Sequence, residues 1–421
     1  MEILYISSVP SPNEFYRIKE TIKDGIDVTT YGMNESGFKF HTLIMDGLCE
    51  KEDVNVLSLV GRSVSSKTHS GLLWKTKKEK TKTNLSCKHL GFLNIPILKQ
   101  IGLGVSFFFN TLSWVYKNRG KEKYIIMDAA YVTVIPFVLF ASNFGNCKTS
   151  AIFCDIYEYM ARVKDARDND DVSFIRKIAR WNTVRNYKRL DSFILLTVQM
   201  NSVVNLLNKP FIVIEGLVDI DMQSTENRLS DKEPGNIIMY AGALREQYGL
   251  KNLIEGFINY KNCNASLWIF GAGDYSSSIV EAESVDSRIQ FFGSINLDEV
   301  IKNEQKASLL INPRSADKEF TKYSFPSKNM EYMVSGTPIL TTKLPGMPIE
   351  YYDYVYLIDG NSANDITRAL EKVFQQTKEQ IHQKGLEARE FVLKNKNNVI
   401  QAKRIIDLLE TNNIIREKKS L

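Results

Sequence analysis

The strongest constraint on the fold is an alternation of short apolar segments with helix-like segments, which runs through the chain twice. In the first half, strand-like segments occur at Ile3–Ser7, Val54–Leu59, Tyr124–Met127, Ser150–Phe153, Phe193–Leu196 and Ile212–Ile214. Helix-like stretches such as 34–49 and 97–117 separate them. Short apolar strands between helices are typical of a parallel sheet covered on both faces. The first half is therefore predicted to be a doubly wound α/β domain.

The alternation stops after Leu217 and restarts at Asn236. Residues 219–234 are polar and lack periodicity, as expected of a linker. The second run of strand-like segments lies at 236–242, 266–271, 289–293, 307–312, 338–342 and 355–357. Because 421 residues exceed what one hydrophobic core supports, two domains are predicted. The predicted bounds are 1–217 for the first domain, 218–234 for the linker and 235–393 for the second domain.

The composition favours a globular protein in a reducing compartment. Five cysteines are odd in number and scattered, which argues against a disulfide framework or a zinc site. The first residues enter a strand without a basic leader, so no signal peptide is expected. The longest apolar runs, Ile101–Tyr116 and Ala129–Ser142, are interrupted by Asn110 and Pro136 and are too short to span a membrane. Both runs are expected to be buried helices.

The net charge of +5 is unevenly distributed. Residues 1–217 hold 29 Lys and Arg against 21 Asp and Glu, whereas residues 218–421 hold 25 against 28. Three basic clusters lie in the first half, at Lys75–Lys82, Lys117–Lys123 and Arg176–Arg189. Such clusters are often solvated faces, but they would also suit an anionic lipid surface, where each cation adds about 1 kcal/mol. Nucleic acid is disfavoured, because no recognised nucleic-acid-binding motif accompanies the clusters.

The segment Phe325–Leu340 predicts a turn, a short helix, a Gly-Thr-Pro stop and a new strand. A helix N-terminus binds phosphate through its free backbone N–H groups and its dipole. Ser327 stands at the expected N-cap, and Lys328 places a positive charge at the same end, which is unfavourable unless an anion binds nearby. Glu331 falls one turn further along. The alternative is an ordinary strand–helix–strand unit with an incidental Lys and Glu.

Other turns at the expected strand ends of the second domain carry glycine or positive charge. They contain Gly242, Arg245, Gly271, Gly293 and Arg314. Open α/β sheets bind ligands at the carboxyl ends of their strands. Glycines there let a ligand approach the backbone, and arginines supply charge for an anion. The Gly-Ala-Gly turn after the second strand lacks the third glycine of a dinucleotide-binding motif, so a nicotinamide cofactor is disfavoured.

Several segments, in this order, resemble the nucleotide-binding half of retaining glycosyltransferases of the GT-B architecture, family 4. They are Ile238–Leu244, Tyr248–Phe257, Leu267–Gly273, Ile289–Gly293 and Asn312–Pro338. The resemblance covers about residues 235–360. In the first half it is limited to Asp155 after a strand, the 196–201 segment, and the 214–216 segment that leads to the linker. The segment Phe391–Leu409 resembles the family's last helix, so residues 394–421 are expected to cross back onto the first domain.

The resemblance implies two Rossmann-like domains that face each other across a cleft, and roles for single residues. Glu331 matches the second acid of the family's Glu-x7-Glu motif and should accept hydrogen bonds from the nucleotide ribose. The turn Phe292-Gly293 matches the position that meets the base, and the Gly242 turn matches the loop that faces the donor phosphates. The rest of the predicted donor site consists of Ser327, Tyr323, Arg245 and Gly271.

Three positions depart from the family pattern. Tyr323 replaces the first acid of the motif, which normally orients the donor sugar, and compensation by Glu319 stays open. Ala243 replaces an Arg and Tyr248 replaces a Lys, so the charge for the phosphates would come from Lys328, Arg314 and Arg245. A branch of the family has the same Phe-Thr-Lys-Tyr-Ser-Phe-Pro-Ser-Lys run at this place, which makes the departures a subgroup pattern.

Two acidic features of the first domain have alternative interpretations. Asp155 follows the expected strand at 151–154, where it would face the cleft and contact the acceptor hydroxyl or the transferred sugar. A helix-capping role fits it equally well. The loop Asp165–Asp171 contains an Asp-x-Asp at 168 and 170, but enzymes of the resembled kind need no metal. A polar loop is preferred, and no metal site is expected.

The sequence thus predicts a cytoplasmic enzyme, peripheral on the inner face of the cell membrane, that builds a bacterial capsule, exopolysaccharide or O-antigen. It would transfer a hexose with retention from a UDP-sugar or GDP-sugar to a glycan or polyprenyl-linked acceptor, without a cofactor. The predicted catalytic residues are Lys328, Arg314 and Asp155. A sugar-nucleotide epimerase of the same architecture and a non-catalytic nucleotide-sugar-binding subunit stay open as alternatives.

Overall fold

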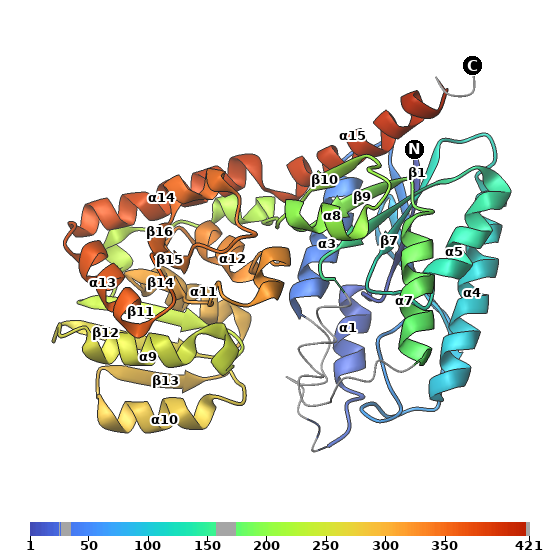
Figure 1. Cartoon of the computed structure of the whole chain (residues 1–421). Coiled ribbons are helices and arrows are strands. Elements are labelled where there is room, and N and C mark those ends of the chain that lie inside the picture. Colours follow the sequence, from blue (N-terminus) through green and yellow to red (C-terminus); the bar gives the residue numbers. More distant parts are fainter. Residues whose placement is uncertain (25, 27–34, 157–173, 418–421) are drawn as a thin grey trace. The chain divides into compact units, whose positions relative to one another are not determined.

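The computed structural model of the chain contains two compact units (Figure 1). The structure describes residues 1–24, 26, 35–156 and 174–417. The first unit comprises Met1–Glu215 and Asn398–Leu421, and the second comprises Gly216–Asn397. Each unit contains one large, mainly parallel sheet with helices around it, which confirms the predicted α/β class.

The first unit is built on an eight-stranded sheet. In spatial order its strands are β10 (Phe211–Val213), β9 (Ser192–Leu195), β8 (Lys148–Phe153), β7 (Lys123–Asp128), β1 (Glu2–Ser7), β2 (Asn55–Val60), β5 (Leu85–His89) and β4 (Lys77–Lys82). Every neighbouring pair is parallel except β4 and β5. Central strands such as β8 are buried along their whole length, which explains why the sequence shows them as apolar runs.

The residues of the edge strand β4 were not predicted to form a strand. The Lys75–Lys82 cluster was expected to be a solvated face or a membrane-contacting patch, whereas Lys77–Lys82 pairs antiparallel with β5. The sequence did not indicate a strand here, because Lys77–Lys82 contains no apolar residue and five of its six residues are charged. Lysines on an edge strand are a common way to prevent pairing with another chain. A structural role therefore accounts for part of this charge.

Helices surround the sheet of the first unit. They are α1 (Pro12–Lys19), α3 (Glu35–Cys49), α4 (Pro96–Lys117), α5 (Ile135–Ser142), α7 (Phe174–Tyr187), α8 (Asn201–Val204) and α15 (Asn398–Glu417). The C-terminal α15 packs against α3, where Gly47 lets the backbone of Asn398 approach closely. The two apolar runs expected to be buried helices form α4 and α5, which lie side by side (Figure 1). Both also carry exposed apolar side chains, so the expectation of full burial is wrong.

The second unit has a six-stranded parallel sheet. Its order is β13 (Ile289–Gly293), β12 (Ala265–Phe270), β11 (Asn236–Ala241), β14 (Leu309–Asn312), β15 (Ile339–Thr342) and β16 (Tyr356–Ile358). The surrounding helices are α9 (Leu250–Asn259), α10 (Ser276–Val285), α11 (Leu297–Lys306), α12 (Ser327–Ser335), α13 (Ala363–Phe374) and α14 (Lys378–Asn395). A core of Ile, Leu and aromatic side chains between sheet and helices includes Tyr240, Phe257 and Leu267.

The segment predicted as a linker, 218–234, is part of the second unit. The Val218 N–H donates to the carbonyl of Lys396 at 3.0 Å. The side-chain amide of Asn227 donates to the Ser335 carbonyl at 2.8 Å and to the Thr337 hydroxyl at 2.9 Å. The segment lacks hydrophobic periodicity because hydrogen bonds of single residues, and not an apolar face, hold it against the rest of the unit.

Candidate active site

The candidate site lies at the switch point of the second sheet. From β11 the chain continues to β12 on one side, and β14 lies on the other side. In open α/β sheets the crevice at this point, outside the carboxyl ends of the strands, binds ligands. Gly242 directly follows β11, and Pro313-Arg314 directly follow β14. Two of the predicted site residues are thus placed at the ends of neighbouring strands.

Close backbone contacts hold the turns after β11, β12 and β13 together. The Gly242 N–H donates to the Phe270 carbonyl at 3.0 Å, and the Gly271 N–H donates to the Gly293 carbonyl at 2.7 Å. Gly242 and Gly271 have φ angles of 140° and 134°. A Cβ on Gly271 would overlap the carbonyl of Gly242, and a Cβ on Gly242 would overlap the side chain of Lys328. Both positions therefore require glycine.

The helix α12 begins one residue earlier than an N-cap at Ser327 would require. Pro326 occupies the N-cap position, no side chain caps the helix, and Ser327 is its first helical residue. The expectation of a Ser327 N-cap is therefore wrong, because the proline ring already holds the backbone before the first turn. The hydroxyl of Ser327 and the first amides of α12 nevertheless remain at the helix start, where an anion would bind.

A tyrosine on α12 fixes this helix to the end of β11. The Ala241 N–H donates to the Tyr332 hydroxyl at 2.8 Å, and that hydroxyl donates to the Ala241 carbonyl at 3.1 Å. Tyr332 is fully buried. The buried side-chain amide of Asn312, at the end of β14, donates to the Asn329 side chain at 2.7 Å. These contacts set the position of the α12 N-terminus relative to both strands of the switch point.

Replacement of Tyr332 by Phe should destabilise the protein by about 1–3 kcal/mol, because two buried backbone groups lose their partner. Urea unfolding of Tyr332→Phe measures the loss. The matched control is Tyr356→Phe, whose hydroxyl makes one hydrogen bond, to Gln376 at 2.9 Å, from a partly exposed position. Equal stability of the two variants would contradict the role of Tyr332.

Lys328 reaches from the first turn of α12 to the side chain of Tyr240, near the end of β11. Its Nζ donates to the Tyr240 hydroxyl at 2.6 Å and lies 3.9 Å from the centre of that ring. The same hydroxyl donates to the carbonyl of Ala243 at 2.9 Å. Burial lowers the pKa of Lys328 to about 7, while Glu331 acts to raise it and Arg314 to lower it. A bound anion would favour the protonated lysine.

Arg314 lies between two aromatic rings. Its guanidinium is 5.2 Å from the centre of the Tyr248 ring and 4.9 Å from that of Phe320. Burial and the neighbouring Tyr248 raise the pKa of Tyr240, and the charge of Arg314 opposes them. Arg314 and Lys328 thus both lie close to the Tyr240 hydroxyl, and their positive charges act on the same part of the site. Tyr248, which stands where the resembled family has a Lys, supports the guanidinium with its ring.

Glu331 lies one helical turn beyond Lys328. Side chains three residues apart share a helix face, and the charge of Glu331 acts directly on Lys328. Glu331 is partly buried. Lys328, Arg314 and Glu331 therefore lie close together, beside the turn that contains Gly242. The site thus combines two cations and one carboxylate with a turn that has no side chain at Gly242.

The remaining predicted donor residues lie in turns of the second unit. Arg245 precedes the short 3-10 helix Glu246–Tyr248, and Tyr323 ends the 3-10 helix Glu319–Tyr323. Phe292 is 46% exposed, and its ring stacks on buried Phe270 at 4.6 Å. Around Gly293 a Cβ would meet no atom within 4 Å, so the backbone of this turn is open to a ligand.

Asp155 belongs to the first unit, where it follows β8 and is exposed. Its charge and that of Asp128, at the end of β7, raise the pKa of the Cys154 thiol, although burial is the larger cause. Asp155 thus lies at the carboxyl end of the sheet in its own unit. The acidic loop with the Asp-x-Asp at 168 and 170 lies outside the described residues.

The sequence interpretation missed Tyr240 and Tyr332. Both side chains belong to apolar segments, so their spacing indicates only that they are buried. A possible signal was the polar tip of each tyrosine, because a buried hydroxyl usually has a hydrogen-bond partner. The identity of that partner, 88 residues away for Tyr240 and 91 residues away for Tyr332, could not be read from the sequence.

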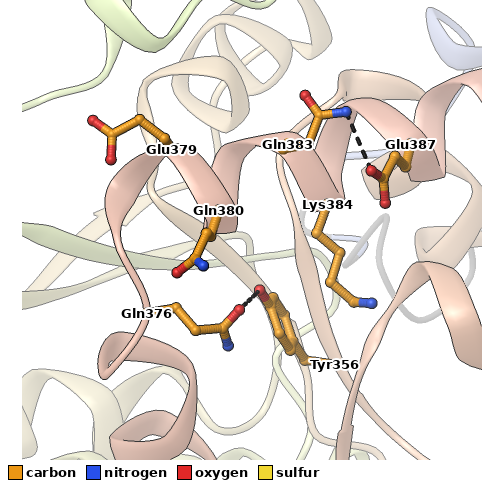
Figure 2. Close-up of a pocket in the computed structure, with 7 residues that line it drawn as sticks. All are labelled: Tyr356, Gln376, Glu379, Gln380, Gln383, Lys384 and Glu387. Carbon is orange, nitrogen blue, oxygen red and sulfur yellow. Dashed lines mark hydrogen bonds between the residues drawn. The ribbon is translucent and has the colours of Figure 1, made fainter.

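The cavity of about 550 Å³ drawn in Figure 2 is elsewhere in the second unit. Its wall consists of Tyr356, Gln376, Glu379, Gln380, Gln383, Lys384 and Glu387. The Tyr356 hydroxyl bonds to Gln376, and the Gln383 amide donates to Glu387 at 3.2 Å. None of the predicted site residues lines this cavity.

Several solved structures share this fold over almost the whole chain. Sucrose-phosphate synthase from Thermosynechococcus elongatus matches with a TM-score of 0.66 at 12% identity, over 98% of this chain and 100% of that chain. HepE from Anabaena in complex with UDP matches with a TM-score of 0.62 at 11% identity, over 98% and 100% of the two chains. HepE with UDP-glucose matches at 0.59 and 12%, over the same shares. No curated protein sequence gives a significant match. The fold is therefore that of the GT-B glycosyltransferases.

Residues 221–390 match the family model "Glycosyl transferases group 1". This segment contains β11 to β16 and all the residues gathered at the switch point. The chain thus contains a glycosyl transferases group 1 domain, in the half where the sequence resembles that family. No helix among the described residues is both long and apolar enough to cross a membrane.

Proposed function

We propose that the chain transfers a hexose, with retention, from a UDP-sugar or GDP-sugar to a hydroxyl of a glycan or polyprenyl-linked acceptor. The observation that carries this proposal is the cluster of Lys328, Arg314 and Glu331 beside the Gly242 turn. HepE, which shares the fold, has been solved with UDP-glucose, and this supports a uridine donor. The bacterial capsule, exopolysaccharide or O-antigen would be the product to which such a transfer contributes.

The proposed chemistry follows from the charges of the site. The bond between the anomeric carbon and the phosphate oxygen breaks, and its electron pair stays on the nucleoside diphosphate. The acceptor hydroxyl bonds to the anomeric carbon on the same face, and its proton passes to the leaving phosphate. Lys328, Arg314 and the first amides of α12 would stabilise the growing negative charge, which is usually the largest catalytic contribution. No protein base and no metal ion are needed for this step.

The other residues would bind the two substrates. Glu331 would accept hydrogen bonds from the ribose, and the open backbone at Phe292-Gly293 would meet the base. Tyr323 would take the place of the acid that orients the donor sugar. Asp155, at the strand ends of the first unit, would contact the acceptor or the transferred sugar. The enzyme would work at the inner face of the cell membrane, where polyprenyl-linked acceptors are found.

Incubation with a panel of UDP-, GDP- and ADP-sugars tests the proposal. One donor should release nucleoside diphosphate, and a lipid-linked or glycan acceptor should accelerate the release. NMR of the product should show the anomeric configuration of the donor. Release of diphosphate with an inverted product would exclude the retaining mechanism.

The same panel separates the two alternatives. A sugar-nucleotide epimerase would convert the donor into an epimeric sugar nucleotide. The nucleoside diphosphate would stay attached to the sugar in that product, so no free diphosphate would accumulate. A non-catalytic subunit would bind nucleotide, as judged by thermal stabilisation, but turn over no donor. Tyr323, Ala243 and Tyr248 favour this last alternative, because each departs from the family pattern. Binding without any turnover would therefore overturn the transferase proposal and leave the donor site intact.

A further inference from the structure

The helix α4 of the first unit has two apolar faces. One face is buried and includes Leu103, Phe107 and Trp114. The other face is exposed and carries Ile97, Leu98, Ile101, Val105, Phe109 and Tyr116, with Ile97 74% and Phe109 61% accessible. A surface helix normally pairs one apolar face with one polar face. The outer face of α4 is instead mostly apolar, with Ser113 as an exposed polar side chain among large apolar ones.

The exposed surface continues beyond α4. At the middle of the helix, Phe108 stacks on Phe140 of α5 at 5.7 Å, and Phe109 and Phe144 contact this pair edge-on. Phe140 and Phe144 are both more than half exposed. Before the helix begins, further exposed apolar side chains are Leu72, Leu73, Leu93 and Ile95. We call this set, together with the outer face of α4, the apolar face. Contiguous exposed apolar patches of this kind mark interaction sites.

The charges around the apolar face are positive. The sequence holds no Asp or Glu between Lys80 and Lys121, and none between Ala129 and Cys154. Lys88 hydrogen-bonds to Asn110 on the polar flank of α4. Burial lowers the pKa of Lys88, and the charges of Lys78 and Lys117 lower it further, so these three lysines lie near one another.

No carboxylate in the described part of the chain pairs with this group of cations. Lys78 and Lys117 are exposed, and neither forms an ion pair with another described residue. The guanidinium of Arg119, just after α4, lies 4.4 Å from the exposed ring of Tyr116. The exposed lysines Lys78 and Lys117 thus place positive charge beside the apolar face.

We propose that the apolar face docks the first unit onto a lipid bilayer that carries anionic headgroups. A helix that lies in the interface buries apolar and aromatic side chains at the headgroup level. Its lysines and arginines reach the anionic headgroups, while their hydrocarbon stems cover apolar surface. The combination of exposed Phe and Ile side chains with bordering cations fits this partner. It also differs from the sequence prediction, which relied on charge clusters alone.

The inference does not depend on the transfer reaction. It assigns a defined surface, with the apolar side chains as the main contact and the cations as a secondary one. Since α4 cannot span a membrane, the expected attachment is reversible and confined to one leaflet. A second copy of the chain, or another protein, could also cover an apolar face. The experiment below distinguishes a second copy from lipid, and an absence of vesicle binding would rule lipid out.

Co-sedimentation with vesicles tests the proposal. The full chain should sediment with vesicles of phosphatidylglycerol and phosphatidylcholine in equal parts, and weakly with phosphatidylcholine alone. Phe109→Ser and Ile101→Ser should each lower the partition coefficient by about tenfold, since each removes one large apolar side chain that the bilayer would bury. Lys117→Gln should have a smaller effect, visible at low salt and lost at high salt because ions screen exposed charges.

Val285→Ser is the matched control, because Val285 is an exposed apolar residue of the second unit. Its partition should equal that of the unaltered chain. All altered side chains are exposed, so melting temperatures should be unchanged and folding defects can be recognised. Vesicle binding that persists in both α4 variants would overturn the proposal, as would no binding to anionic vesicles. An unaltered chain that forms dimers, which Phe109→Ser converts to monomers, without binding vesicles would assign the apolar face to a second copy.

Discussion

Lys328→Met should lower kcat/KM for sugar transfer by about 10²–10³-fold, the usual loss when one preorganised donor to a developing anion is removed. The structure places Lys328 Nζ over Tyr240, next to the Gly242 turn and in the first turn of α12. A methionine of similar length keeps the packing and removes only the charge and the hydrogen bond. Steady-state kinetics with the donor identified in the panel measure the effect.

Lys343→Met is the matched control for this variant. Lys343 also lies over a tyrosine ring in the second unit, 4.9 Å from the centre of Tyr352, but outside the candidate site. Its replacement should leave kcat/KM within about twofold, because a single exposed lysine contributes little. Similar losses in both variants would indicate a general effect on the domain and contradict a role in catalysis.

The pKa of Lys328 adds a dependence on pH. Burial lowers this pKa to about 7 in the free protein, so the lysine is protonated below pH 7 and neutral above it. A diphosphate favours the protonated form and raises the pKa, so donor binding should weaken as pH rises through about 7. A sugar nucleotide is the suitable probe, since its phosphates do not titrate in this range. The dependence should vanish in Lys328→Met.

Glu331→Ala should raise the Kd for the nucleotide by about tenfold to a hundredfold. A hydrogen bond to a charged group contributes about 1.5–3 kcal/mol, and the carboxylate is proposed to accept from the ribose. The sharper measurement compares a nucleoside diphosphate with its 2′,3′-dideoxy analogue. The unaltered chain should prefer the ribose form, and the preference should disappear in Glu331→Ala.

Glu281→Ala serves as the control, because Glu281 is an exposed acid on α10 of the same unit. Its preference for the ribose form should match that of the unaltered chain. If Glu331→Ala kept the full preference for ribose, Glu331 would contact another part of the donor. Loss of affinity for both analogues by the same factor would mean that Glu331 acts through Lys328, whose charge it stabilises.

The sequence determined the architecture of the second unit well. Its strands are short, largely apolar runs, and β14 and β15 are buried along their whole length, so the pattern alone located β11, β12, β13, β14 and β15. The same local rules placed Lys328 and Glu331 on one face of a short helix, since residues three apart in a helix are neighbours. What each of these side chains binds is a proposal that rests on this placement.

Only the tertiary structure decided which distant groups meet. Lys328 contacts Tyr240 across 88 residues, and Arg314 rests on the ring of Tyr248. The tertiary structure also decided that 218–234 belongs to the second unit and that Lys77–Lys82 is an edge strand. It left one apolar face of α4 exposed. Sequence periodicity indicates whether a residue suits burial. Whether another segment covers that residue, and which one, depends on packing between segments far apart in the chain.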